Sequence, residues 1–206
     1  MRVTAGKAPQ PEAPDRRILD IAAAHIRKFG LKRTTIVGIA SEAGMSHANI
    51  YRYFPSKQAL FEAVTEHWLR PLEATIREIR DGPDPAYDKL ERIVGTVHAA
   101  YREKLENDPD IFAVFAEATQ AGLGIARRHR NRLQAELART IEEGMSGGGF
   151  AQSDQRRALA LVFDALHRFI HPNAVLLDAE ATRAQLDARF ERMVRLLLGG
   201  LIRGKL

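Results

Sequence analysis

The sequence predicts an all-α protein of about nine helices, divided into a small N-terminal helical domain and a larger C-terminal one. Three observations favour this class. Apolar residues recur at i, i+3 and i+4 through most of the chain, which is the period of an amphipathic helix. Helix-capping residues precede many of these segments, and glycine or proline follows many of them. The length of 206 residues leaves room for a second domain with its own core.

The composition excludes several classes of protein. The chain is 45% hydrophobic and 28% charged, as soluble globular proteins are, and no apolar run approaches the roughly 18 residues that span a bilayer. Residues 1–14 contain three prolines and no apolar segment, so we expect a flexible tail and not a signal peptide. The absence of cysteine excludes disulfides and thiolate chemistry. We therefore expect a cytoplasmic protein without a membrane partner.

The first predicted helix covers residues 15–29, and Gly30 closes it. Its apolar stripe consists of Ile18, Leu19, Ala22, Ile26 and Phe29. The next helix covers residues 36–43. Thr35 is expected to cap its N-terminus, because the threonine hydroxyl can accept a hydrogen bond from an unpaired backbone N–H. Gly44 ends this helix, because the residue after a helix often needs a positive φ that glycine reaches without steric cost.

A third short helix is predicted at residues 47–54, with Ser46 as its cap and Pro55 as its end. Two helices joined by a short turn that contains glycine form a helix-turn-helix, a unit that places its second helix in the DNA major groove. A tight helical corner can also be simple scaffolding. The residue types favour the first interpretation, because tyrosine, arginine and lysine side chains near a helix start suit phosphate oxygens.

The two faces of helix 47–54 have different expected roles. Ile50 and Phe54, at i and i+4, are assigned to the core. This assignment leaves Ala48, Asn49 and Arg52 pointing outward, where they can meet a partner.

Basic charge is concentrated in the N-terminal third of the chain. Residues 1–70 contain eleven Lys or Arg against six Asp or Glu, whereas residues 71–206 contain twenty of each. Arg16, Arg17, Lys32 and Arg33 stand where a flanking arm and a loop could meet phosphates. A basic solvated surface is the alternative. Together with the helix-turn-helix, the charge indicates a polyanionic partner.

This N-terminal segment resembles the DNA-binding signature of the tetracycline-repressor (TetR) family. The resemblance begins at Ile18 and covers about fifty residues. Its most specific part is the run Thr34-Thr35, Ile39-Ala40, Glu42-Ala43-Gly44-Met45-Ser46, Ile50-Tyr51, Tyr53-Phe54, Ser56-Lys57 and Leu60-Phe61. The resemblance implies a dimeric, ligand-responsive transcriptional regulator, most often a repressor, that binds double-stranded operator DNA. It implies a DNA-binding domain at residues 15–60 and a ligand-binding and dimerisation domain at residues 61–206.

The candidate DNA contacts fall into two groups. Asn49 and His47 are candidates for base edges, because an amide can pair bidentately with adenine and the N-terminus of a recognition helix enters the groove first. Ala48 lies beside them on the outward face. The phosphate contacts are assigned to Thr35, Tyr51, Arg52, Tyr53 and Lys57.

A long helix is predicted at residues 57–80, which would join the two domains. Pro71 lies inside it and predicts a kink between about His67 and Pro71, unless two helices meet there. Five further helices are predicted at residues 86–106, 110–119, 125–145, 154–171 and 181–201. The third of these starts with a basic cluster that we interpret as a solvated face: Arg127, Arg128, His129, Arg130 and Arg132.

The last two predicted helices are apolar on more than one face, which indicates that each packs against other helices on two sides. The residues concerned are Leu159, Val162, Phe163, Leu166, Phe169 and Ile170, and Leu186, Phe190, Met193, Val194, Leu197, Leu198 and Leu201. We therefore expect a homodimer through a four-helix interface with a two-fold axis that matches a palindromic operator. A monomeric core that absorbs both faces is the alternative.

No catalytic motif is present: the glycines at 147–149 lack the lysine of a phosphate-binding loop, and there is no Gly-x-Ser-x-Gly. We expect no enzyme and no required cofactor. One candidate metal site remains, because Asp164, His167 and His171 share a helix face and His98 could complete the set. The alternative is that these histidines have structural roles. A metal-responsive regulator of the same fold, and a metal-dependent all-α enzyme, stay open as rivals.

A polar patch in an apolar cavity would equally suit a small organic effector. We expect such an effector to lie among the four helices between residues 86 and 171. The candidate ligand-binding residues are His98, Tyr101, Phe112, Phe115, Phe163 and His167. A constitutive DNA-binding module with a solid core is a further rival, and a cavity between these helices would distinguish the two.

Overall fold

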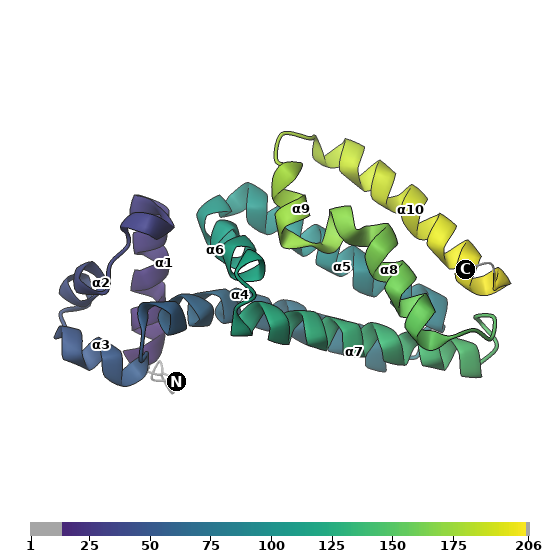
Figure 1. Cartoon of the computed structure of the whole chain (residues 1–206), viewed down its shortest axis with the longest axis horizontal. Coiled ribbons are helices and arrows are strands. Elements are labelled where there is room, and N and C mark those ends of the chain that lie inside the picture. The colour runs from purple at the N-terminus through teal and green to yellow at the C-terminus, as the bar shows by residue number, and fades with distance from the viewer. Residues whose placement is uncertain (1–13, 205–206) are drawn as a thin grey trace, which may run out of the picture. The chain divides into compact units, whose positions relative to one another are not determined.

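The computed structural model describes residues 14–204, and the regular structure in this part of the chain is entirely α-helical (Figure 1). The chain divides into two compact units, Met1–Val64 and Thr65–Leu206. The predicted tail at residues 1–14 lies, apart from Pro14, outside the described residues. No helix in the described range is both long and apolar enough to cross a bilayer.

The N-terminal unit begins with α1 (Pro14–Arg33), α2 (Ile36–Ala43) and α3 (His47–Tyr53). Gly30 interrupts α1 with a φ of 75°, so the predicted end of the first helix is a real break after which the chain turns helical again to Arg33. Helix α2 packs against both α1 and α3. The core of this unit includes the fully buried Ile18, Ala22, Ile26, Ile39, Ile50 and Leu60, whereas Phe29, which the sequence placed on the apolar stripe of the first helix, is 43% exposed.

Helix α3 ends one residue earlier than predicted. Phe54 is the C-cap in an extended conformation and is only half-buried, whereas Ile50 is fully buried. The residue before a proline avoids helical angles, so Pro55 removes Phe54 from the helix and from the i, i+4 pair. Ile50 alone fixes the inner face of α3.

Helix α4 (Lys57–Asp81) starts in the N-terminal unit and continues into the C-terminal unit, where the boundary falls between Val64 and Thr65. It runs as one helix through Pro71, so two helices do not meet there. The Thr75 hydroxyl donates to the backbone carbonyl of Pro71. Whether the axis bends at this proline stays a prediction.

Six further helices complete the C-terminal unit. They are α5 (Ala86–Asn107), α6 (Pro109–Gln120), α7 (Gly124–Ser146), α8 (Gln155–Ile170), α9 (Pro172–Leu177) and α10 (Arg183–Arg203). The described residues thus contain ten helices, because the short α9 joins the nine that the sequence predicts.

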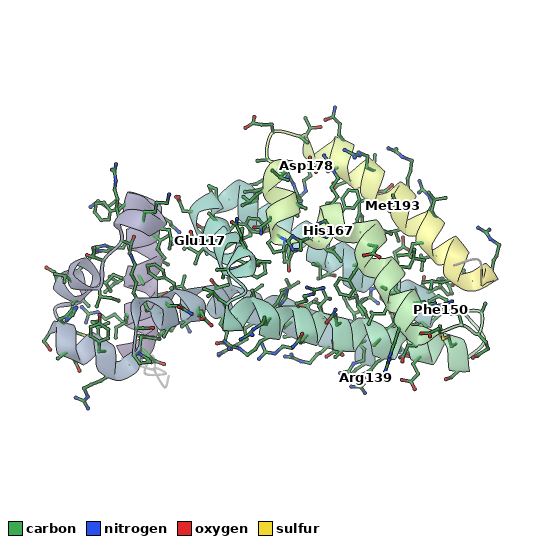
Figure 2. The ribbon with its side chains drawn as sticks, viewed as in Figure 1. Glu117, Arg139, Phe150, His167, Asp178 and Met193 are labelled. Atoms are coloured by element: carbon green, nitrogen blue, oxygen red, sulfur yellow. The ribbon has the colours of Figure 1, made fainter. Side chains whose placement is uncertain are left out.

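Helix α5 is the centre of this unit. It packs against α6, α7, α8, α9 and α10, and in Figure 1 it passes behind α8 and α9. Leu90, Ile93, Val94 and Val97 on α5 are completely buried. Side chains fill the space between α5, α7, α8 and α10 (Figure 2). Packing on α5 therefore fixes the relative positions of α6, α7 and α8, and so the shape of any pocket that lies between these helices.

Helices α8 and α10 pack on each other and on α5. Of the thirteen apolar residues that predicted a double covering, ten are buried within one chain, so most of this surface needs no second chain. What remains is a smaller apolar surface. On α10, Leu196 is 69% exposed and Ile202 is half exposed, while Met193 is partly buried.

Candidate nucleic-acid interface and effector cavity

Side-chain hydroxyl groups cap the N-termini of α2, α3 and α4. The hydroxyl oxygens accept from backbone N–H groups, with N···O distances of 3.1 Å for Thr35 and Gly38, 3.2 Å for Ser46 and Asn49, and 3.0 Å for Ser56 and Ala59. Gly44 between α2 and α3 has a φ of 65°, the left-handed conformation that glycine adopts most easily. The turn and caps predicted from the sequence are therefore present.

The outer face of α3 is polar and accessible. His47, Ala48 and Arg52 are exposed, and so are the rings of Tyr51 and Tyr53. Asn49 is half-buried. The His47 ring meets Tyr51 edge-on, with 4.7 Å between ring centroids. Since Ile50 is anchored in the core, these side chains project from a fixed helix and can reach a partner.

The two predicted phosphate contacts outside α3 lie at helix starts. Thr35 is exposed, although its hydroxyl already serves as the α2 cap. Lys57 is half-buried at the start of α4, and its ammonium lies 5.2 Å from the centroid of the Phe61 ring. A helix N-terminus with a cation beside it suits a phosphate oxygen.

The sequence reasoning missed Val37, which is 65% exposed beside the Thr35 cap. A signal was available, because Val37 falls outside the apolar stripe of α2. An exposed apolar side chain next to candidate DNA contacts can meet a thymine methyl group or a sugar.

The orientation of α2 on α1 is fixed by a long-range pair. The buried His25 on α1 places Nε2 2.6 Å from a carboxylate oxygen of Glu42 on α2. Gly38 packs beside this imidazole, since a Cβ at that position would lie 3.0 Å from His25 Cε1. Glycine at 38 therefore allows the close approach of the two helices.

The C-terminal unit contains a cavity of about 300 Å³ among α5, α6, α7 and α8, next to the start of α9. Its wall is mixed, with aromatic and aliphatic side chains as well as arginine, histidine and aspartate. The lining residues are Tyr101, Phe115, Thr119, Gly122, Ala126, Arg127, His129, Arg130, Leu133, Phe163, Asp164, His167, Ile170, His171 and Pro172. Several of them are exposed, so the cavity communicates with solvent.

A chain of buried hydrogen bonds leads from the cavity to α4. Tyr101, 1% exposed, pairs its hydroxyl with His129 Nε2 at 2.8 Å. His129, 2% exposed, pairs Nδ1 with Glu73 Oε1, also at 2.8 Å. Arg132 donates to the second carboxylate oxygen of Glu73 at 2.8 Å. Tyr101 and His129 line the cavity, whereas Glu73 belongs to α4, so the chain joins the wall of the cavity to that helix.

Glu73 remains ionised despite its burial. Burial acts to raise its pKa, but the hydrogen bond and positive charge from His129, with the charge of Arg132, outweigh it and hold the pKa below the ordinary value. Because an ionised carboxylate can only accept, Nδ1 of His129 carries the hydrogen of the bond to Glu73. Burial, followed by the charge of Glu73, raises the pKa of Tyr101, so its hydroxyl stays protonated.

Two family models match the chain. One, described as bacterial regulatory proteins of the tetR family, matches residues 18–64, and another, described as a tetracyclin repressor-like C-terminal domain, matches residues 86–194. The chain belongs to the TetR family. It is therefore a DNA-binding transcriptional regulator, and regulators of this family bind operator DNA, act as dimers and respond to small-molecule effectors.

Curated relatives agree with this assignment. The TetR-family chain is 26% identical over 166 residues to the transcriptional repressor KstR2 of Mycolicibacterium smegmatis, a match that covers 78% of this chain and 76% of the relative. It is 36% identical over 78 residues to the transcriptional regulator RutR of Escherichia coli, covering 36% and 37% of the two chains. The higher identity falls in the shorter match.

Solved structures share the whole fold. The fatty acid degradation regulator FadR of Bacillus halodurans is 25% identical with a TM-score of 0.67, and the match covers 95% of this chain and 98% of that one. FadR of Bacillus subtilis, solved in complex with stearoyl-CoA, is 20% identical with a TM-score of 0.69 over 90% and 98% of the two chains.

Four of the six predicted ligand-binding residues of this TetR-family chain line the cavity: Tyr101, Phe115, Phe163 and His167. The expectation that His98 and Phe112 join them is wrong. Phe112 is fully buried among aromatic rings of the core. His98 is stacked on Phe190 of α10, with 4.4 Å between centroids, and its Nε2 lies 3.0 Å from Asp187. Binding by the other four stays a prediction.

The predicted metal site is not assembled. Within residues 14–204, no three His, Cys, Asp or Glu side chains are grouped so that they could hold a metal ion. Asp164, His167 and His171 all line the cavity, but the two imidazoles stack on each other at 4.4 Å. His98 is occupied by Asp187 and Phe190. Sharing a helix face did not bring these ligands to one point.

The basic start of α7 is only partly a solvated face. Arg127 and Arg130 are exposed, but both line the cavity. His129 is buried against Tyr101 and Glu73, and Arg132 is paired with Glu73. The prediction was wrong for His129, since its partner stands on α4, far away in the sequence.

Proposed function

We propose that this protein is a repressor that leaves a palindromic operator when a small organic molecule occupies the cavity among α5 to α8. The observation that carries the proposal is the coexistence, in one chain, of an exposed and firmly capped α3 with an accessible cavity. A constitutive binding module with a solid core would lack the cavity. The repressor relatives and the effector-responsive family agree with this interpretation.

The DNA contacts that we propose keep the division between bases and phosphates. Asn49 and His47 meet base edges, with Ala48 packed beside them, because they stand in the first turn of α3. Tyr51, Arg52 and Tyr53 meet phosphates from the same helix, and Thr35 and Lys57 do so from the starts of α2 and α4.

For the dimer we propose the outer sides of α8 and α10. Leu196 on α10 is 69% exposed, and Ile202 on the same helix is half exposed. Leu161 of α8 and Met193 of α10 are only partly buried within one chain and are apolar side chains that a second copy could cover further (Met193 is labelled in Figure 2). A second copy of the chain would cover these side chains and present two α3 helices to two half-sites.

We further propose that α4 carries the signal. Glu73 on α4 is hydrogen-bonded to His129, which lines the cavity. The same helix contributes Lys57 and begins beside the DNA-reading helices of the N-terminal unit. An effector shifts the population only if it binds one arrangement more tightly than the other, and disturbance of this buried chain provides such a difference.

The test has two stages on the full-length protein. Selection of bound sequences from random DNA should enrich a two-fold symmetric motif with two half-sites. A thermal-shift screen of small molecules should then find compounds that raise the melting temperature and release the selected DNA. No enriched motif, or no compound that both stabilises the protein and releases DNA, would contradict the proposal.

A further inference from the structure

The charge of the cavity is unbalanced. Its lining includes two arginines, Arg127 and Arg130 on α7, and one carboxylate, Asp164 on α8. Neither arginine forms an ion pair with a carboxylate in the described part of the chain, whereas the neighbouring Arg132 is paired with Glu73. Arginine side chains that lack a carboxylate are open to a bound anion.

The remaining titratable groups of the lining do not reverse this balance. His171 has a pKa below the ordinary value, because of burial first and then the charges of His167 and Arg130. His129 is already occupied by Glu73 and Tyr101. Asp164 is exposed and supplies one negative charge against the two arginines. The lining therefore favours an anion over a cation.

The buried part of the wall is apolar. Phe115 on α6, Leu133 on α7 and Ile170 on α8 are buried in the core, and Phe163 is packed against it. Pockets for small ligands usually measure roughly 300–1,000 Å³, so a volume of about 300 Å³ lies at the small end. The space suits a compact hydrocarbon or aromatic body.

We propose that the effector is a small organic acid, with an apolar body among Phe115, Leu133, Phe163 and Ile170 and an ionised carboxylate at Arg127 and Arg130. The proposal rests on the function proposed above and names the chemical class of its effector. A guanidinium group matches the two oxygens of a carboxylate. An apolar amine of equal size would instead add a third positive charge beside the two arginines.

Three probes with the same apolar body separate the possibilities: octanoate, octan-1-ol and octylamine. Each is titrated into the full-length protein, with binding followed by thermal shift and calorimetry and operator release followed by fluorescence anisotropy. Octanoate should bind about 10- to 100-fold more tightly than octan-1-ol, the range expected for a charge-assisted hydrogen bond. Octylamine should bind more weakly than either.

Variants of the α7 arginines test where the carboxylate of octanoate binds. Arg127→Gln with Arg130→Gln should remove the preference for octanoate over octan-1-ol, chiefly by weakening octanoate binding. Arg139→Gln is the control, because Arg139 is an exposed arginine of α7 outside the cavity (Figure 2). It should leave the preference intact. If the double variant keeps the preference, the arginine assignment is overturned.

The ranking of the probes decides the chemical class. Octylamine as the best binder, equal affinity for all three probes, or binding of none overturns the organic-acid proposal. A neutral or cationic compound from the wider screen that releases the operator overturns it too, but leaves the proposed repressor function standing. Failure to select any operator contradicts the repressor function instead, and the affinities for the three probes can still be measured.

Discussion

The DNA-reading corner and the effector cavity are held in place in different ways. Around α2, α3 and α4 the caps connect residues three positions apart, such as Ser46 with Asn49, and one longer-range pair, His25 with Glu42, orients α2 on α1. Around the cavity the hydrogen bonds connect distant segments, such as Glu73 with His129 and Tyr101 with His129. The first region is a set of rigid local caps with an exposed polar face. The second depends on buried polar pairs between helices, which a ligand or a proton can disturb.

The largest expected effect tests whether the N-terminal region binds a polyanion. If a dimer neutralises about six to ten phosphates, its operator affinity should fall by about 10³- to 10⁵-fold between 50 and 200 mM salt, because bound counterions are released from DNA. Fluorescence anisotropy across this salt series measures the effect. The affinity of the cavity for octan-1-ol should hardly change over the same series. An operator affinity that does not depend on salt would contradict the prediction that the N-terminal region binds a polyanion.

The second prediction tests the surface that pairs two copies. Leu196→Glu places a charge on the exposed side of α10 and should convert the dimer to a monomer. Loss of the second half-site contact should weaken operator binding by about 10²- to 10⁴-fold. Analytical ultracentrifugation and anisotropy measure the two outcomes.

Leu177→Glu is the control for this variant, because Leu177 on α9 is also an exposed leucine, at 88% against 69% for Leu196, but lies outside the α8 and α10 surface. It should remain a dimer. A dimeric Leu196→Glu protein would place the interface elsewhere.

The third prediction tests the link between the cavity and α4. Glu73→Gln leaves His129 and Arg132 without their carboxylate, and breaking a buried pair in this way costs about 3 to 5 kcal/mol of unfolding free energy. The variant should still bind the effector, because Glu73 does not line the cavity. The bound effector should release the operator from the variant less well than from the unaltered protein. Denaturant unfolding, calorimetry and anisotropy measure the three quantities.

Glu136→Gln is the matched control, because Glu136 of α7 also pairs with α4, through Arg80 at 3.3 Å, but stands outside the cavity. It should release the operator normally. Tyr101→Phe gives a second test if Glu73→Gln does not fold, since it removes only the hydroxyl at the cavity end of the chain. Normal operator release in both Tyr101→Phe and Glu73→Gln would exclude the buried chain from signalling.

The fourth prediction divides the surface of α3 from the start of α4. Asn49→Ala should cost about 1 to 3 kcal/mol of binding free energy on the operator and relax the preference at one base pair. Lys57→Ala should weaken binding to every sequence alike and reduce the salt dependence. Binding arrays with single-base operator variants compare the two. Equal losses on operator and random DNA for both variants would contradict the assigned roles.

The contrast between local and distant bonds also explains what the sequence could predict. Thr35, Gly44 and Ser46 announce their roles because each cap and turn acts within a few residues. The short α9 was missed because Pro172 looks like the end of α8, whereas it is the first residue of a new helix. Proline suits both positions, so residue type alone does not decide between them.

The wall of the cavity was harder to predict for a different reason. Phe112 and Phe115 stand three residues apart on α6, yet only Phe115 lines the cavity, because the position of the neighbouring helices selects one ring and buries the other. The pairing of His129 with Glu73 leaves no local trace at all: in the sequence, His129 is one member of a basic run. Contacts of this kind follow from helix packing and not from spacing along the chain.

The smallest expected effect concerns His98, which the sequence placed in the cavity and the fold places between α5 and α10. Burial lowers its pKa, although Asp187 acts in the opposite direction, so the folded protein binds this proton less readily than the unfolded chain does. Unfolding free energy should therefore decline as the pH falls from the unfolded value near 6.5 toward the lower pKa of the folded state. Urea unfolding between pH 7.5 and 5.5 measures the decline. His171 contributes in the same direction, because burial lowers its pKa too. His98→Gln should flatten the decline and His171→Gln should do so separately. A slope that both variants leave unchanged would mean that other groups set the acid sensitivity of the C-terminal unit.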